Sequence, residues 1–450
     1  MNLSYSGRAR ELLESAGAKD YDLLRVTAGR RIYEGILMPR PEILDDLHVV
    51  LKMSNGYNVG IDVEKISSVE VLGRARPPER PSPPRVSPRE GLPSVPIVVT
   101  GGTIASRVDY STGAVKPTET PEELIDLVPE IAELANVSYV PLMAKLSEDI
   151  RPEEWGRIAK KVAEELNSGA SGVVVAHGTD TMHYTASALA LMLEGLTGPV
   201  VLVGSQRSID RPSTDAVLNV TAAVRVAAEG PMAESVIVMH GSTSDDFAWV
   251  IRGVRARKMH TSRRDAFMSV NEAPLARVTE KSIEILNPRF RRRPSEPTEV
   301  VARVEIEPRV ALVHAWPGIE RGFLEAVVSS GYRGIVMAGT GLGHVPNRIV
   351  DEIGAIVDSG IPVVVTSQCL FGRVDLKVYA TGRRMLQAGV IPAADTLPEV
   401  ATVKLMVALG RGMEGEDLRR FMTTSQVGEL TETISPSAYP PCFSGGARVG

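Results

Sequence analysis

Thr103 stands on a glycine turn directly behind an apolar run, in the stretch IVVTGGTIAS at residues 97–106. The β-branched residues before Gly101 and Gly102 predict a buried strand that ends at the glycines. A threonine hydroxyl is a poor nucleophile unless a neighbouring group accepts its proton. The stretch therefore has two interpretations: the glycines only shape a strand-to-helix turn, or they expose the Thr103 hydroxyl for nucleophilic attack.

Groups that could accept this proton stand elsewhere in the chain. AHGTDTM, at residues 176–182, supplies Thr179 followed by Asp180, and the basic stretch RKMHTSRRDAF, at residues 257–267, supplies Lys258. An aspartate can position a lysine amine, and burial lowers the pKa of such an amine towards neutrality. Spacing alone does not show that these residues meet. His177, in the first of these stretches, is interpreted as a structural hydrogen-bonding residue rather than a base.

Continuous apolar runs that end in small or polar residues alternate with helical patterns after residue 93. Strands that are apolar throughout and alternate with helices predict largely parallel sheets covered on both faces, so the expected fold class is α/β. In such sheets ligands bind at the carboxyl ends of the strands. The apolar runs lie at residues 95–100, 172–178, 199–205, 235–241, 309–315, 334–341 and 362–368, with helical patterns at 152–169 and 184–196.

Composition divides the chain into three predicted domains and two linkers. The first linker is rich in proline, which favours extended chain. Short strand-like runs precede it, with a hairpin turn at Asn55–Gly56, and they predict a small antiparallel β-barrel of the SH3-like kind. The expected boundaries are 1–74 for the barrel, 75–93 for the linker, 94–284 for a large α/β domain, 285–299 for a second linker and 300–450 for a smaller α/β domain.

Composition also argues against several classes of function. A net charge of −5 gives no general reason to expect a nucleic-acid surface, and Cys369 and Cys442 suggest neither a disulfide framework nor a zinc site. The sequence has no Gly-x-Gly-x-x-Gly that opens a helix and no Gly-Lys-Ser/Thr loop, so we expect no cofactor and no metal in this chain. Without a signal-peptide core or a membrane-length apolar run, the expected location is the cytoplasm, away from membranes. RFRRRP, at 289–294, is interpreted as solvated or acid-paired.

TGGTIAS and HGTDTM, in this order and each at a strand end, resemble the paired signature of the L-asparaginase/glutaminase amidohydrolases. The resemblance extends from about Val95 to about Leu430 and implies two asparaginase-like α/β domains. It implies that Thr103 is the nucleophile, and that Thr179, Asp180 and Lys258 form a second catalytic group, in which lysine and aspartate activate a threonine.

The same resemblance implies substrate-binding residues and a contribution from a neighbouring copy. Tyr110 matches a tyrosine that polarises the nucleophile. Ser147 and Asp180 match the groups that hold the substrate's α-carboxylate and α-amine, with Glu148 beside them. In secreted members a carboxylate from the neighbouring copy completes the site; Asp375 is a candidate for that role here, although a structural aspartate in a turn is favoured.

The small barrel, the proline-rich linker, KMHTSRRDAF and LRRFMTTSQVGEL together resemble one branch, the archaeal glutamyl-tRNA(Gln) amidotransferase D subunits. This implies that the chain releases ammonia from glutamine or asparagine. A separate E-type partner would bind Glu-tRNA(Gln), use ATP and Mg²⁺, and form Gln-tRNA(Gln), in a heterotetramer built on a homodimer of this chain. Two alternatives stay open: a free-standing L-asparaginase/glutaminase, and a non-catalytic scaffold that binds tRNA or a partner. The barrel's role is likewise open between a packing module and docking of RNA or a partner.

Overall fold

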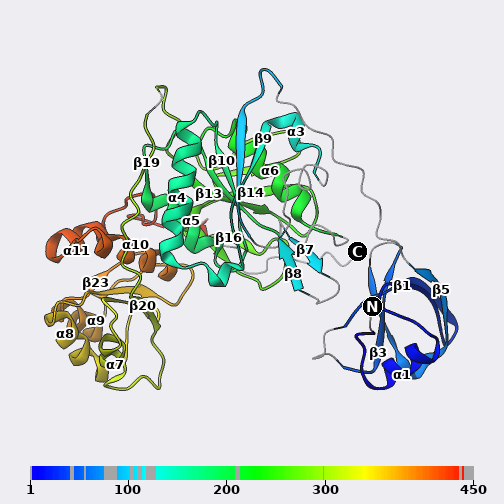
Figure 1. Ribbon diagram of the computed structural model, residues 1–450. Coiled ribbons are helices and arrows are strands. Elements are labelled where there is room, and N and C mark those ends of the chain that lie inside the picture. The colour runs from blue at the N-terminus through cyan, green and yellow to red at the C-terminus, as the bar shows by residue number, and fades with distance from the viewer. Residues whose placement is uncertain are drawn as a thin grey trace, which may run out of the picture. The chain divides into compact units, whose positions relative to one another are not determined.

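The computed structural model describes residues 3–40, 45–54, 57–74, 89–101, 106–109, 114–117, 128–207, 213–296, 298–434 and 438–439. The chain divides into two compact units (Figure 1). One unit contains the N-terminal β domain, and the other contains both α/β sheets. No helix in the described part of the chain has the length and apolar character that a membrane span needs.

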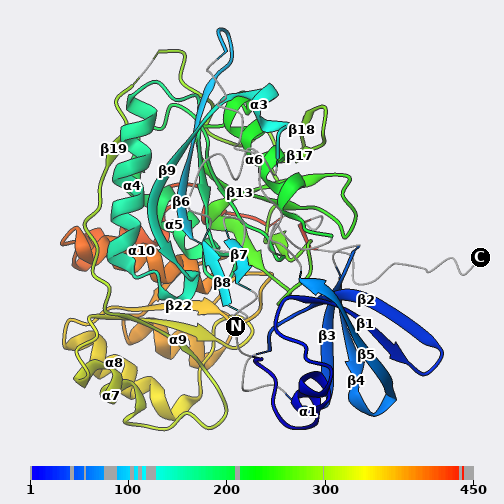
Figure 2. The same ribbon diagram turned by 45° about the vertical axis from the view of Figure 1, so that its right-hand side comes forward.

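The N-terminal β domain is a five-stranded antiparallel sheet with strand order β4-β3-β2-β1-β5, and Figure 2 shows the sheet curling. Alternating inward residues such as Leu24, Val26 and Leu51 are fully buried, together with Leu13 of the N-terminal helix. This confirms the small antiparallel domain; the predicted turn at Asn55–Gly56 lies outside the described residues. The elements are α1 (Gly7–Ser15), β1 (Asp22–Ala28), β2 (Arg31–Leu37), β3 (His48–Met53), β4 (Asn58–Asp62), η1 (Val63–Lys65) and β5 (Ile66–Arg74).

A large eight-stranded sheet forms the centre of the second unit, in the order β18-β17-β14-β13-β12-β10-β6-β9. The five strands from β13 to β9 are parallel, as expected. Nearly all residues of β13, β12, β10 and β6 are buried, whereas those of the edge strand β9 are half-buried or exposed. The strands are β6 (Ser94–Gly101), β9 (Asn136–Lys145), β10 (Val173–Ala176), β12 (Val200–Val203), β13 (Ser235–His240), β14 (Ala248–Arg252), β17 (Ala276–Val278) and β18 (Ile283–Ile285).

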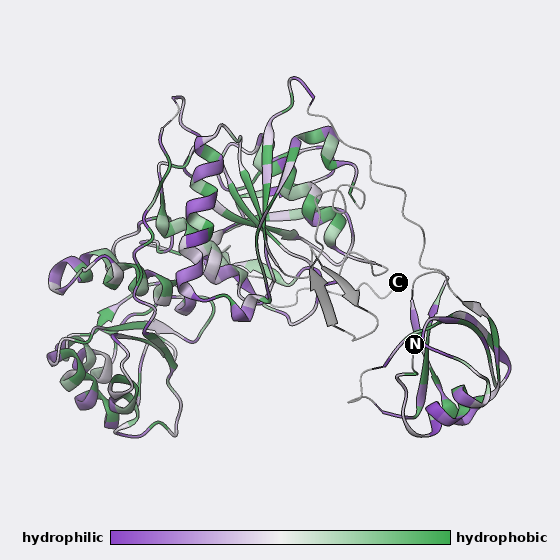
Figure 3. Ribbon diagram, viewed as in Figure 1, coloured by the Kyte–Doolittle hydropathy of each residue, from purple (hydrophilic) through white to green (hydrophobic). Residues whose placement is uncertain are grey.

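The other edge of this sheet is antiparallel: β14 pairs with β13, β17 with β14, and β18 with β17. Residues 241–247 join β13 to β14, and a parallel return would need a crossover of a dozen or more residues. α4 (Pro152–Asn167) and α5 (Met182–Met192) lie on one side of the sheet and α6 (Ala216–Glu229) on the other (Figures 1 and 2). α4 turns an apolar face inward and a hydrophilic face outward (Figure 3).

The C-terminal sheet has four parallel strands in the order β20-β21-β22-β23 and its own buried cluster, which includes Ile335, Met337 and Val365. Its strands and helices are β20 (Val310–His314), α7 (Phe323–Ser329), β21 (Gly334–Gly339), η5 (Asn347–Ile349), α8 (Val350–Asp358), β22 (Val363–Ser367), α9 (Ala380–Gln387) and β23 (Ile391–Pro392). Together with the large sheet and the N-terminal domain, this confirms the expected fold class, with the large sheet mixed rather than wholly parallel.

Helix α10 (Pro398–Gly410) joins the two sheets into one core. It packs against α5 of the large domain and against β20 and β21 of the C-terminal sheet (Figure 1). Every residue from Pro398 to Ala408 is buried, including the charged Glu399 and Lys404. A helix buried on all sides needs partners for such charges, and Lys404 Nζ lies 2.6 Å from Glu429 Oε1, with both side chains fully buried. Helix α11 (Gly415–Thr423) follows and packs on α10.

In the arginine-rich segment at 289–294, one arginine has a structural role that differs from the solvated or acid-paired role expected from the sequence. Arg289, Arg291 and Arg292 are exposed, as a solvated stretch would be. Arg293 instead is partly buried, and its guanidinium donates to the carbonyl oxygens of Ala227 and Gly230 at the end of α6, at 2.9 and 2.6 Å. The last carbonyls of a helix lack intrahelical partners, so this arginine caps α6.

Candidate active site

The ends of β9, β6 and β10 are neighbours, and this adjacency builds the site. Thr100 Oγ1, near the end of β6, donates to the carbonyl oxygen of Ala176, the last residue of β10, at 2.9 Å. On the other side of β6, Gly101 pairs with Lys145, the last residue of β9. The strand that leads to the GGT turn therefore ends between the segment that carries Ser147 and the loop that carries Thr179.

Gly101 is required by its surroundings. Its φ is +116°, and a Cβ added there would lie 2.1 Å from the carbonyl oxygen of Lys145. At least the first glycine of the pair therefore serves the close approach of two strands. Thr103 and Tyr110 lie outside the described residues, so their roles stay predictions.

Thr179, Asp180 and Lys258 come together at this edge of the sheet. The 177–181 loop joins β10 to the first turn of α5, and Lys258 is the last residue of the short strand β15 (Ala256–Lys258). Lys258 Nζ donates to Thr179 Oγ1 at 2.8 Å and to Asp180 Oδ1 at 2.7 Å. Thr179 is buried and the Lys258 side chain is 10% exposed, whereas the Asp180 side chain is 66% exposed. The ammonium thus touches a buried hydroxyl, while the carboxylate stays open to a ligand.

Ser147 lies against the same loop. It begins the single turn η3 (Ser147–Asp149), which follows β9. Thr181 Oγ1 donates to the Ser147 carbonyl oxygen at 2.7 Å, and a Cβ added to Gly178 would lie 2.8 Å from the Ser147 Cβ. Ser147 is buried, and Glu148 beside it is exposed. Sequence reasoning did not assign Thr181 or Gly178 a role, although both stand inside the HGTDTM motif.

The two histidines of this region are buried and neutral near neutral pH. His177 Nδ1 lies 2.7 Å from the Gly178 carbonyl oxygen, and its Nε2 lies 2.8 Å from Thr185 Oγ1. Burial lowers the pKa of His177 to about 4. Burial, followed by the nearby positive charge of Arg257, lowers the pKa of His183 to about 3. The contacts of His177 are those of a structural hydrogen-bonding residue.

Asp375 occupies a local turn. Its Oδ1 accepts from the backbone N–H of Lys377 at 3.1 Å, and its own N–H donates to the Leu342 carbonyl oxygen at 3.1 Å. A side chain that accepts from the N–H two residues on is the ordinary arrangement of an aspartate turn. This geometry agrees with the structural role that the sequence favoured for Asp375.

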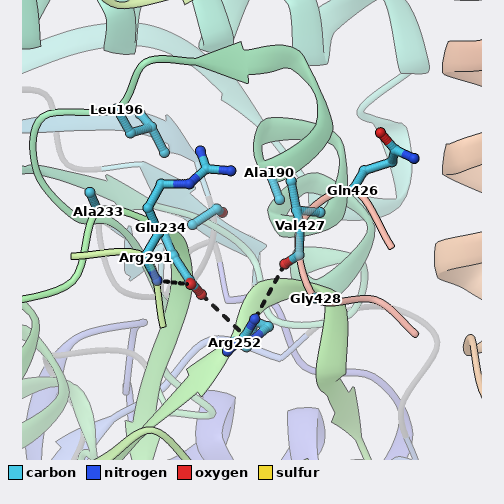
Figure 4. Close-up of a pocket in the computed structure, with 10 residues that line it drawn as sticks. Ala190, Leu196, Ala233, Glu234, Arg252, Arg291, Gln426, Val427 and Gly428 are labelled. Atoms are coloured by element: carbon cyan, nitrogen blue, oxygen red, sulfur yellow. Dashed lines mark hydrogen bonds and ion pairs between the residues drawn. The ribbon is translucent and has the colours of Figure 1, made fainter. Parts of the chain in front are cut away.

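A cavity of about 210 Å³ lies apart from these residues (Figure 4). Arg252 lines it between Glu234 and the 426–428 loop, and it donates to the Val427 carbonyl oxygen. None of Ser147, Thr179 or Lys258 lines it. Within the described residues, no three His, Cys, Asp or Glu side chains are grouped so that they could hold a metal ion.

Comparison with known proteins assigns both α/β domains. The family model "Asparaginase, N-terminal" matches residues 94–291, and "Glutaminase/Asparaginase C-terminal domain" matches residues 309–422. Among solved structures, the L-asparaginase of Thermococcus kodakarensis is 32% identical and matches with a TM-score of 0.68, covering 76% of this chain and all of its own. L-asparaginase I of Vibrio cholerae is 28% identical, with a TM-score of 0.66 and the same coverage. The fold and the site therefore define an asparaginase-type amidohydrolase.

The N-terminal domain and the full-length relatives specify the branch. "GatD N-terminal domain" matches residues 18–72. The D subunit of the glutamyl-tRNA(Gln) amidotransferase of Pyrococcus furiosus is 48% identical over 96% of this chain and 99% of its own length. That of Pyrococcus abyssi is 50% identical over 94% and 98%, and that of Thermofilum pendens 45% identical over 98% and 99%. The chain belongs to the family of glutamyl-tRNA(Gln) amidotransferase D subunits.

Proposed function

We propose that this chain is the amide-hydrolysing, ammonia-donating component of a tRNA-dependent amidotransferase, which converts Glu-tRNA(Gln) to Gln-tRNA(Gln). One observation carries the proposal: Lys258 Nζ lies within hydrogen-bond distance of both Thr179 Oγ1 and Asp180 Oδ1. A scaffold that only binds tRNA or a partner has no use for a lysine held on a buried threonine. The full-length likeness to amidotransferase D subunits supports the tRNA-dependent reaction over simple amide hydrolysis.

The proposed reaction begins at the side-chain amide of glutamine or asparagine. The Thr103 hydroxyl attacks the amide carbon, and its proton passes through the Thr179 hydroxyl to Lys258 in its neutral amine form, beside Asp180. The carbon–nitrogen bond of the tetrahedral intermediate then breaks, and the same proton returns through Thr179 to the nitrogen, which leaves as ammonia. Water then hydrolyses the acyl-threonine ester and regenerates Thr103. Backbone N–H groups near Thr179, at the start of α5, stabilise the oxyanion, because the N-terminus of a helix favours negative charge.

The remaining site residues hold the donor amino acid. Asp180 is exposed and carries the charge that an α-ammonium group requires. Ser147 receives the α-carboxylate, with Glu148 beside it, and Tyr110 polarises the nucleophile. Ser147 is held against the 177–181 loop, so donor binding and catalysis share one rigid support.

Ammonia would pass to a partner of the E type. That partner binds Glu-tRNA(Gln) and activates its glutamate with ATP and Mg²⁺, in a heterotetramer built on a homodimer of this chain. We propose a cytoplasmic location, because the acceptor is an aminoacyl-tRNA. The division 1–74, 75–93, 94–284, 285–299 and 300–450 is proposed as the domain organisation, with the N-terminal β domain serving the complex rather than the chemistry.

A free-standing L-asparaginase is the second candidate, since solved L-asparaginases match about three quarters of the chain. The deciding experiment measures ammonia release from glutamine and from asparagine by the purified chain, alone and with an E-type partner plus Glu-tRNA(Gln). The amidotransferase proposal expects slow release alone and a marked rise with partner and tRNA. Full activity alone, with no response to either addition, would favour the free-standing enzyme.

A further inference from the structure

Lys258 is presented to Thr179 by a strand that has little hydrogen bonding of its own. Among the described strands, β15 pairs only with the three-residue β16 (Phe267–Ser269) in a two-stranded sheet, where Lys258 is opposite Phe267. Isolated two-stranded pairings are marginally stable in water. Successive side chains of a strand point to opposite faces, so Arg257 points away from the side on which Lys258 meets Thr179.

Both arginines that flank Ala256 are held by acidic residues, one in the segment before α10 and one in its first turn. Arg257 Nη1 contacts Glu399 Oε1, in the first turn of α10, and this side chain of Glu399 is 6% exposed. Arg255 Nη1 lies 3.0 Å from Asp395 Oδ2, and both of these side chains are fully buried. We name these two ion pairs the α10 clamp. It joins the C-terminal part of the chain to the strand that carries Lys258.

We propose that Glu399 is a positioning residue: through Arg257, the first turn of α10 fixes β15 so that Lys258 Nζ reaches both Thr179 and Asp180. This inference rests on the proposed function for the role of Lys258. The inference goes beyond the proposed function, because it assigns a role in the chemistry to an acidic side chain that contacts none of Thr179, Asp180 and Lys258.

The second ion pair, between Arg255 and Asp395, already attaches the chain just before β15. Glu399 therefore acts on the orientation of β15 and not only on its attachment. Asp395 also accepts from the backbone N–H and the hydroxyl of the partly buried Thr431, at 2.8 and 2.7 Å, so the buried Arg255 is anchored to a carboxylate that is itself held in place. Arg255 fixes the chain where β15 begins, at the end of η4 (Gly253–Arg255). Glu399 fixes it again two residues later, directly before Lys258. The two anchors restrict the orientation of the chain around residue 257, and Lys258 Nζ reaches Thr179 and Asp180 of the 177–181 loop.

The chain offers a matched control for an Arg–Glu pair that does not adjoin Lys258. Arg252 Nε lies 2.9 Å from Glu272 Oε1, and these side chains are 9% and 10% exposed. Arg252 ends β14, five residues before Arg257 in the same run of chain. Glu272→Gln therefore removes one acidic partner of a comparably buried arginine, which keeps Glu234 at 3.5 Å, and it leaves the Arg257–Glu399 pair intact.

The experiment compares Glu399→Gln, Glu272→Gln and the double variant Arg257→Met/Glu399→Met in the full-length chain. The double variant removes both charges, so it folds without an unpaired buried arginine. Steady-state donor hydrolysis should show kcat lowered about tenfold or more in both Glu399 variants, because lost positioning acts on the chemical step. KM for the donor should change less than kcat, because Thr181 holds Ser147 through a contact that does not involve Lys258. Glu272→Gln should keep the wild-type kcat, even if its melting temperature falls as much as that of the Glu399 variants.

A readout that needs no turnover keeps the inference testable by itself. Reaction of Lys258 with an acylating reagent, followed by mass spectrometry, should become several-fold faster in both Glu399 variants and stay unchanged in Glu272→Gln. Unchanged Lys258 labelling and unchanged kcat per folded molecule in the Glu399 variants would overturn the inference and leave Glu399 a packing partner. A wild-type chain that hydrolyses neither amide, with labelling as expected, would instead count against the proposed function alone.

Discussion

Lys258 Nζ lies 2.8 Å from Thr179 Oγ1, although 79 residues separate the two in the chain. Thr179 follows the central strand β10. Lys258 ends the short strand β15, which the Arg257–Glu399 ion pair joins to α10. This contact provides a path for a proton: Thr179 can pass one to Lys258 when the lysine is a neutral amine, and the neighbouring Asp180 balances the charge of the ammonium that forms.

Replacing the proposed nucleophile should remove nearly all activity. Thr103→Ala deletes the attacking hydroxyl, so amide hydrolysis should fall by about 10⁴-fold or more. The melting curve should barely change, because the substitution removes only a hydroxyl and a methyl group. A near-normal rate of ammonia release from this variant, with normal melting, would refute the threonine mechanism.

Lys258→Met tests the proton-transfer group. Methionine keeps most of the apolar stem and removes the ammonium, so turnover should be abolished while the folded protein persists. Activity per folded molecule and the urea midpoint are measured on the same sample. If the variant unfolds readily but its folded fraction keeps the wild-type rate, Lys258 is only the ion-pair partner of Asp180.

Thr181→Val should act on donor binding. Valine has the shape of threonine but cannot donate to the Ser147 carbonyl oxygen, and a hydrogen bond of this kind contributes about 1 kcal/mol. Because Ser147 then loses its fixed place against the 177–181 loop, we expect KM for glutamine or asparagine to rise about fivefold. The change in kcat should be smaller. Thr181→Ser, which keeps the hydroxyl, is the control. Loss of kcat at constant KM would contradict this role.

Buried neutral His177 should make the fold sensitive to mild acid. Its pKa is lowered to about 4 in the folded chain, whereas an unfolded histidine titrates near about 6.5. Between these pH values the unfolded chain binds the proton and the folded chain does not. The free energy of unfolding therefore falls as pH decreases, by about 1.4 kcal/mol per pH unit at most from this residue, and is fully retained above pH ~6.5.

Urea unfolding at pH 7, 6 and 5 measures this dependence. His177→Gln keeps a hydrogen-bonding side chain without the titration, so its stability should decline less steeply over the same range. His183, with a pKa of about 3, contributes in the same direction and remains in the variant. Equal slopes for wild type and His177→Gln would show that His177 is not held neutral in the folded protein.

Removal of residues 1–92 separates the N-terminal β domain from the chemistry. The described candidates Ser147, Thr179, Asp180 and Lys258 belong to the other compact unit, which has its own apolar cores. The truncated chain should therefore fold and keep the basal rate of amide hydrolysis. It should lose part of the stimulation by partner and Glu-tRNA(Gln), measured as the ratio of stimulated to basal rate. An unchanged ratio would remove the domain from the proposed coupling.

Much of the architecture could be predicted from the sequence because its causes are local. Runs such as residues 172–176 are apolar throughout, and only a strand buried on both faces stabilises such a run between two helical patterns. The helix at Pro152–Asn167 has the 3.6-residue repeat of an amphipathic helix with one buried face. The motif residues Thr179, Asp180 and Lys258 were identified by residue type and by resemblance, both of which are properties of the chain alone.

The tertiary structure decided what these residues touch. Glu399, Lys404 and Glu429 are charged and would be placed on the surface by type, yet all three are buried. They are buried because α10 lies between two sheets, and the cost of removing each charge from water is offset by a partner distant in sequence: Arg257 for Glu399, and Glu429 for Lys404. The contact between Lys258 and Thr179 has the same origin. The local sequence pattern determines which face of a strand is apolar. Only the packing of whole elements determines which side chains, distant in the sequence, contact that face.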